Sequence, residues 1–126
     1  MFTGTHVLLY STNAEADRAF LRDTLGLRFV DVGGGWLIFG LPPAELGVHP
    51  GDGSFVQQHG GEQQMGAVVY LMCDDVRAVM KQLEARGVAF GTVLEEQWGI
   101  STSIRLPSGG FIGLYQPKHP TALNLK

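Results

Sequence analysis

Apolar residues alternate or recur in two similar halves of the chain. In "HVLLYS", residues 6–11, successive residues point to opposite faces, which is typical of a strand. "AEADRAFLRDTL" then predicts a helix, with Asn13 as its N-cap and Gly26 just beyond its end. Three predicted strands follow, "LRFVDV", "GWLIFG" and "AELGVHP". The first half therefore reads as strand, helix and three strands.

The second half repeats this order of elements. "AVVYLMC" predicts a strand, and Cys73 or Asp74 is placed to cap the helix "DVRAVMKQLEAR", which ends at Gly87. Its apolar residues recur at helical spacing. The strands "VAFGTVLEE", "GISTSIRL" and "FIGLYQP" follow, the last after the turn "PSGG". His6 and Ala67 are separated by the same interval as Gly26 and Gly87, so we interpret the chain as a duplication.

A length of 126 residues with 44% hydrophobic residues predicts one domain, residues 1–126, with a real core. Its parts are module 1 at about 1–50, a loop-like linker at 51–65, module 2 at about 66–117 and a tail at 118–126. The modules are too small to be secure alone, so we expect them to complete one structure.

Charge and cysteine content exclude several classes of protein. The net charge is −3 and no basic run is present, so no nucleic-acid partner is expected. No apolar stretch is long enough to span a bilayer, and the first residues lack a signal peptide's basic region, so no membrane partner is expected. The single cysteine, Cys73, allows no internal disulfide and favours the reducing cytoplasm.

Three segments resemble the vicinal oxygen chelate superfamily, which includes glyoxalase I, bleomycin-resistance proteins and extradiol dioxygenases. They are "AFLRDTLGLRF" (19–29), "CDDVRAVMKQLEARGVAF" (73–90) and "RLPSGGFIGLYQP" (105–117), and the match departs at Leu106, where the family commonly has aspartate. The resemblance implies an α+β fold of two βαβββ modules forming a half-open barrel, with helices on the outer faces. It also implies a homodimer. Function does not follow from such a fold.

In enzymes of this family a divalent metal is held by side chains from the first and last strand of each module. Carried over, these positions are His6, Gly47, Ala67 and Gly113, and only His6 can ligate. No cofactor is therefore expected. A divergent metal site remains as an alternative, because alternation puts Glu45 and His49 on the face of Gly47. Against it, these two residues lie about 13 Å apart on an extended strand.

A cavity that has lost its metal ligands and is ringed by aromatic residues suits a flat organic molecule. We therefore predict a metal-free protein that binds or sequesters an aromatic or drug-like compound. The alternative is a metal-dependent lyase, isomerase or dioxygenase around His6, or an enzyme with His6 or Glu45 as general base. The polar face that Ser101, Ser103 and Arg105 share lines the cavity or faces solvent. The predicted ligand-binding residues are His6, Leu8, Tyr10, Glu45, His49, Trp98, Arg105, Phe111 and Tyr115.

Overall fold

The computed structural model describes Met1 and residues 4–125; residues 2 and 3, and Lys126 at the end of the predicted tail, lie outside the described part. Contacts divide the chain into two compact units. Unit 1 comprises Met1–Gly40 and Leu106–Gly110, and unit 2 comprises Leu41–Arg105 and Phe111–Lys126.

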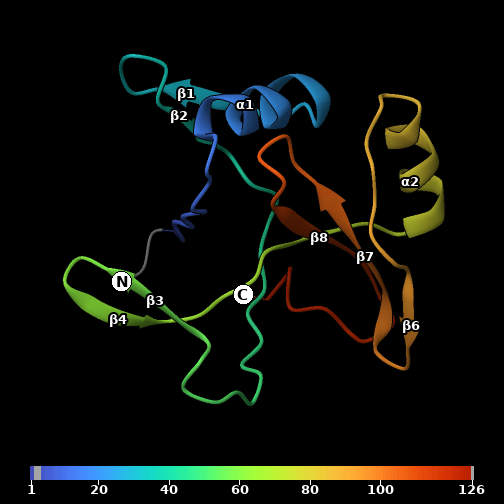
Figure 1. Ribbon diagram of the computed structural model, residues 1–126. Coiled ribbons are helices and arrows are strands. Elements are labelled where there is room, and N and C mark those ends of the chain that lie inside the picture. Colours follow the sequence, from blue (N-terminus) through green and yellow to red (C-terminus); the bar gives the residue numbers. More distant parts are fainter. Residues whose placement is uncertain (2–3, 126) are drawn as a thin grey trace. The chain divides into compact units, whose positions relative to one another are not determined.

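Unit 1 is built from a helix and a short hairpin (Figure 1). Helix α1, Ala14–Ala19, continues as the π-helical turn η1, Phe20–Thr24. The predicted cap is confirmed, because the Asn13 side chain accepts a hydrogen bond from the backbone N–H of Ala16 at 3.2 Å. Strands β1, Phe29–Asp31, and β2, Leu37–Phe39, then pair antiparallel across a turn that contains three glycines with positive φ, Gly33, Gly34 and Gly35.

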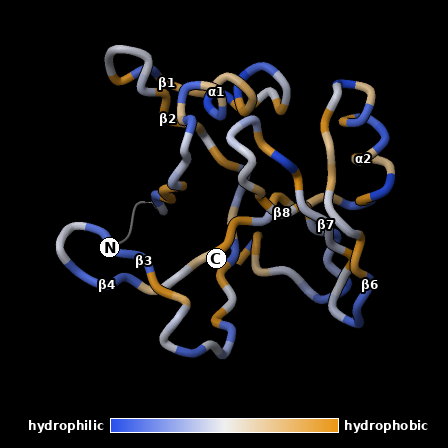
Figure 2. Tube along the Cα trace, viewed as in Figure 1, coloured by the Kyte–Doolittle hydropathy of each residue, from blue (hydrophilic) through white to orange (hydrophobic). Residues whose placement is uncertain are grey.

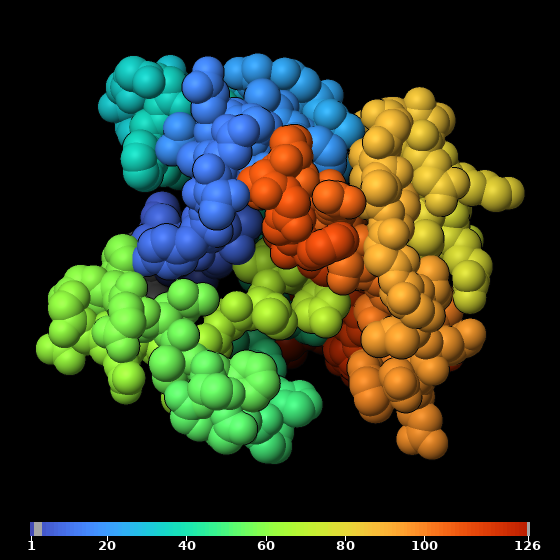
Figure 3. All heavy atoms as spheres, in the orientation of Figure 1, coloured from blue at the N-terminus to red at the C-terminus, as the bar shows by residue number. Residues whose placement is uncertain are grey.

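Asp17 connects the turn at 106–110 to the start of helix α1 through hydrogen bonds. Its side chain is only 7% exposed, and it accepts hydrogen bonds from the Ser11 hydroxyl at 2.6 Å and the Ser108 backbone N–H at 2.9 Å. Figure 3 shows the turn at 106–110, in orange, against the blue segment that contains α1. Burial acts to raise the pKa of Asp17, but the hydrogen bonds from Ser11 and Ser108 outweigh it, and the pKa lies below the ordinary value of 3.8.

Unit 2 contains a four-stranded sheet in the order β5–β8–β7–β6. Strands β8, Phe111–Pro117, and β7, Gly99–Arg105, pair antiparallel at its centre; β5, Tyr70–Met72, joins β8 in parallel, and β6, Leu94–Glu96, joins β7. The alternation of "GISTSIRL" and "FIGLYQP" predicted the two central strands correctly.

Helix α2, Val76–Glu84, covers one face of this sheet. Asp75 caps it by accepting a hydrogen bond from the Ala78 N–H; this cap lies one residue after the predicted Asp74 and two after the predicted Cys73. The Gln116 side chain of β8 accepts a hydrogen bond from the Val76 N–H at 2.9 Å, which ties the helix to the strand. Because every second residue of a strand shares a face, the side chains of Ile112 and Leu114 also lie on the helix side. The buried apolar core of unit 2 is formed by Val76, Leu83, Val88, Ile100, Ile104, Ile112 and Leu114.

The segment predicted as a loop at 51–65 contains a hairpin instead. Strands β3, Val56–His59, and β4, Glu62–Met65, pair antiparallel. Gly60 and Gly61 have φ of 62° and 81°, as a two-residue hairpin turn requires, and this turn chemistry overrode the weak apolar pattern. The hairpin is hydrophilic along most of its length (Figure 2), which is why the apolar pattern did not indicate it.

Two predicted strands form no β-ladder in the described part of the chain, namely "HVLLYS" at 6–11 and "AELGVHP" at 44–50. Alternation favours an extended backbone, but a strand also needs a neighbour to pair with, and alternation does not supply one. Prolines at 42, 43 and 50 further limit pairing of the second segment. The α+β class itself is confirmed. Within the described residues, no helix is long and apolar enough to cross a membrane.

Candidate functional site

The face of the four-stranded sheet opposite α2 carries the largest group of predicted site residues, and we call it the open face. The register of β7 against β8 identifies the residues of this face: Ser101 pairs with Tyr115, Ser103 with Gly113 and Arg105 with Phe111. None of these is on the side of the buried Ile100 and Ile104. The polar side of β7 therefore lies beside the aromatic side of β8. The open face consists of Tyr70, Leu94, Ser101, Ser103, Arg105, Phe111, Gly113 and Tyr115.

Tyr115 lies at the centre of an aromatic row in unit 2. Its ring is 5.7 Å from that of Tyr70 and 5.8 Å from that of His119, measured between centroids. Its hydroxyl donates a hydrogen bond to the backbone carbonyl of Trp98 at 2.8 Å, which fixes the ring orientation. The Tyr70 and Trp98 side chains remain 50% and 59% exposed as residues, so apolar ring surface is available to a ligand.

Glu45 joins this row through the tail of the chain. One carboxylate oxygen accepts the backbone N–H of Ala122 at 2.9 Å, and the other lies 3.9 Å from Nε2 of His119. Burial, followed by the charge of Glu45 and by Tyr70, raises the pKa of Tyr115, so the phenol stays protonated near neutral pH. His119, in the C-terminal tail, is packed against Tyr115.

The remaining predicted residues of unit 2 are less closely grouped. Arg105 is exposed on the open face and makes no ion pair among the described residues. His49 is exposed, and its Nδ1 lies 2.6 Å from the Pro50 carbonyl. The Glu95 carboxylate of β6 is 3.3 Å from the Lys118 ammonium and 4.0 Å from the Arg77 guanidinium.

His6, Leu8 and Tyr10 belong to unit 1, and they lie in the segment that forms no ladder. All three are exposed. Their part in ligand binding stays a prediction.

The four positions where the resemblance implies metal ligands do not fit a divalent ion. Gly47, Ala67 and Gly113 have no donor atom in their side chains. At Gly113 there is also no room, because an added Cβ would fall 2.7 Å from Cγ of the Tyr70 ring. Among the described residues, no three His, Cys, Asp or Glu side chains are grouped as metal ligands would be.

Cys73 is not arranged as a nucleophile. Burial is the main effect, and it raises the pKa of the thiol. The hydrogen bond with the Asp75 backbone acts to lower this pKa, and the charges of Asp74 and Asp75 act to raise it. A thiolate is the reactive form, so a raised pKa opposes reactivity near neutral pH.

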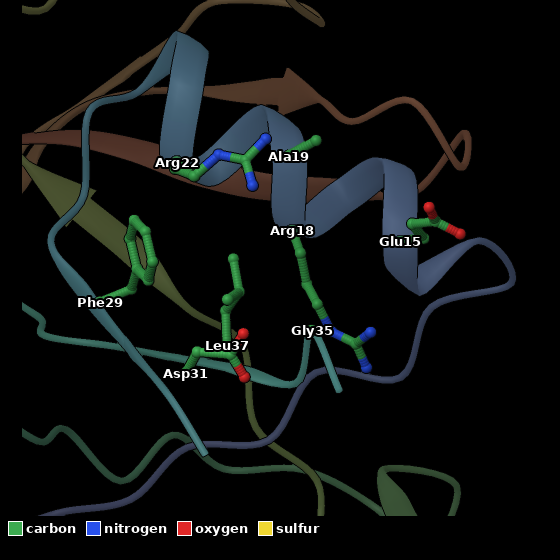
Figure 4. Close-up of a pocket in the computed structure, with 8 residues that line it drawn as sticks. All are labelled: Glu15, Arg18, Ala19, Arg22, Phe29, Asp31, Gly35 and Leu37. Carbon is green, nitrogen blue, oxygen red and sulfur yellow. The ribbon is translucent and has the colours of Figure 1, made fainter. Parts of the chain in front are cut away.

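Unit 1 has a cleft of about 300 Å³ between α1 and the β1–β2 hairpin, which the sequence did not predict (Figure 4). Arg22 is bound by Asp23 through two hydrogen bonds of 2.7 and 2.8 Å, and the Arg18 guanidinium lies 4.6 Å from the centre of the Trp36 ring. The cleft carries two basic and two acidic side chains, so their formal charges cancel. It is lined by Glu15, Arg18, Ala19, Arg22, Phe29, Asp31, Gly35 and Leu37.

Comparison with known proteins adds information on the fold. No family model and no curated protein matches the chain, whereas 12 solved chains do. TnmS3, an antibiotic binding protein from Streptomyces sp. CB03234, has a TM-score of 0.58 and 25% sequence identity, with 94% of this chain and 100% of that chain covered. A glyoxalase/bleomycin resistance protein from the same organism has a TM-score of 0.52 and 25% identity, with 84% and 93% covered.

Lactoylglutathione lyase from Agrobacterium tumefaciens has a TM-score of 0.57 and 22% identity, with 90% of this chain and 92% of that chain covered, a likeness of fold alone. Together with the βαβββ-like second half, these similarities define an α+β protein of the glyoxalase/bleomycin resistance type. The chain belongs to the vicinal oxygen chelate superfamily, as its sequence motifs predicted.

Proposed function

We propose that this protein binds a small aromatic molecule of antibiotic type on the open face, and that it does so without a metal and without chemical conversion. The observation that carries the proposal is the composition of that face. It places Tyr115 beside Ser101 and Phe111 beside Arg105, with Ser103 between them on the same face; Phe111 is exposed, and Tyr115, Ser101 and Ser103 are half-buried. Ligand sites combine apolar rings with a few polar groups in this way.

Charged side chains of opposite sign lie toward the two ends of the open face. Arg105 lies at one end of β7, and Ser101 lies four residues away, about 13 Å along an extended strand. The Glu45 carboxylate lies near the other end, beside Tyr115 and His119. A ligand with its rings over Tyr115 and a carboxylate, phenolate or carbonyl at Arg105 would match both ends. Similarity to an antibiotic binding protein supports the same class of ligand.

Titration calorimetry with a panel of aromatic antibiotics, run with and without EDTA, tests this function. We expect at least one compound to bind equally well in both conditions and to be recovered unchanged by mass spectrometry. Phe111→Ala should weaken binding about threefold to tenfold, the contribution of one aromatic contact. Phe55→Ala is the matched control, because this ring is also exposed but belongs to the approach to the hairpin. A requirement for metal, or a product of altered mass, would favour the lyase or dioxygenase alternative.

We also propose that the protein is a homodimer that acts in the cytoplasm. The dimer is what the family resemblance implies, and the reducing compartment fits a chain whose only cysteine is Cys73. Light scattering at micromolar concentration tests the first statement: a mass near twice 13.6 kDa is expected, and a monomeric mass would contradict it.

A further inference from the structure

Two glycines of the central strands each have a tyrosine ring in the space where a side chain would be. A Cβ built on Gly113 would lie 2.7 Å from Cγ of Tyr70, and a Cβ built on Gly99 would lie 2.9 Å from Cζ of Tyr115. Both distances are below the 3.0 Å that real Cβ atoms respect. The two rings therefore lie against the sheet backbone because residues 113 and 99 are glycine.

The two rings are adjacent and tilted. Their planes make an angle of 58° and their centroids are 5.7 Å apart, so they form a corner that offers two ring surfaces. Tyr70 is half exposed, and it lies directly across from Gly113 in the parallel pairing of β5 with β8. An aromatic ligand of a single ring would contact one of these surfaces. A fused ring system is wide enough to contact both.

We propose that Tyr70, seated over Gly113, is the specificity-determining residue that selects fused aromatic ligands over single-ring ones. The inference rests on the proposed binding function and adds the class of ligand to it. The Tyr70 ring also occupies the space at residue 113, one of the four positions where the family resemblance implies a metal-binding side chain. Gly113 is thus required by an aromatic neighbour.

Packing of a tyrosine over a glycine also stabilises sheets without any ligand, so the test must separate the two roles. Tyr70→Leu keeps an apolar side chain over Gly113 and removes the ring. Tyr70→Phe keeps the ring and removes the hydroxyl. Trp36→Leu is the matched control, because it removes an exposed aromatic ring from unit 1. Proton NMR of Gly113 reports on the geometry: the ring-current shift of its Hα protons should persist in Tyr70→Phe and disappear in Tyr70→Leu.

Binding is measured by fluorescence and calorimetry with two pairs of probes, 9-aminoacridine with aniline and 9-anthracenecarboxylate with benzoate. The wild-type protein should prefer the fused member of at least one pair. Tyr70→Leu should lose about threefold to tenfold in affinity for that member and little for its single-ring partner, while Tyr70→Phe and Trp36→Leu keep the preference. An unchanged preference in Tyr70→Leu would overturn the role of Tyr70 and leave the binding function standing. If neither the probes nor the antibiotics bind, both proposals fall.

Discussion

Asp17 offers a sharp test of how unit 1 is held together, because one buried carboxylate joins three parts of the chain. Its oxygens accept from Ser11 before the helix and from Ser108 in the turn 106–110. In Asp17→Ala both donors lose their partner. Each buried donor left unsatisfied costs about 1–3 kcal/mol, and water can reach the Ser11 hydroxyl more easily than the Ser108 N–H. We therefore expect a loss of about 3 kcal/mol in the free energy of unfolding.

For a chain of 126 residues this corresponds to a fall of about 10 °C in Tm. Asp17→Asn keeps one oxygen acceptor and should lose roughly half as much. Glu15→Gln is the matched control, because Glu15 lies in the same first turn of α1 but is exposed. Urea unfolding followed by circular dichroism measures all three. Equal effects of Asp17→Ala and Glu15→Gln would refute the argument, since the helix dipole alone would then explain both.

The pH dependence gives a second readout of the same contact. The pKa of Asp17 is lower in the folded protein than its ordinary value of 3.8. Its contribution to stability is therefore complete above the unfolded pKa and is lost as the pH falls through the folded pKa. The difference in stability between the wild type and Asp17→Asn should be constant from about pH 7 to pH 5 and should shrink below about pH 4. A difference that grows in acid would contradict the assignment.

Three further predictions concern unit 2. Tyr115→Phe removes the hydrogen bond to the Trp98 carbonyl and should cost about 1 kcal/mol in urea unfolding with a change in tryptophan fluorescence; an unchanged spectrum and stability would show that the bond is not formed. The Cys73 thiol, whose pKa is raised, should react with Ellman's reagent more slowly than free cysteine at pH 7, and a faster reaction would refute the effect of burial. Gly87→Ala should destabilise the end of α2 by about 1 kcal/mol because φ is 82° at this position, and a neutral or stabilising result in thermal unfolding would contradict it.

Local chemistry made the helices and the central strands predictable. Asn13 caps α1 as expected, and Gly26 and Gly87 have the positive φ that a helix end favours. These features depend on neighbours within a few residues. The segments 6–11 and 44–50 show the limit of the same reasoning, because their alternation is clear and yet no ladder forms in the described structure. Pairing partners are a property of the whole fold.

The same limit applies to the open face. Alternation along β7 and β8 indicated that Ser101 and Arg105 share one face and that Gly113 and Tyr115 share another. Only the register of the strands brings these faces together. Tyr70 was missed because nothing in the sequence places it opposite Gly113. The available signal was the glycine itself, which is unfavourable in the interior of a strand unless another group lies close to it.

The central claim is that a ligand lies on the open face of the β5–β8–β7–β6 sheet and needs no metal. Mapping by ¹⁵N NMR of the tightest-binding aromatic compound in the presence of EDTA tests it most directly. Shift changes should be largest at Ser101, Ser103, Gly113 and Tyr115 and small along α2 and the β1–β2 hairpin. Changes centred on the cleft of unit 1, or none until a divalent metal is added, would contradict the account.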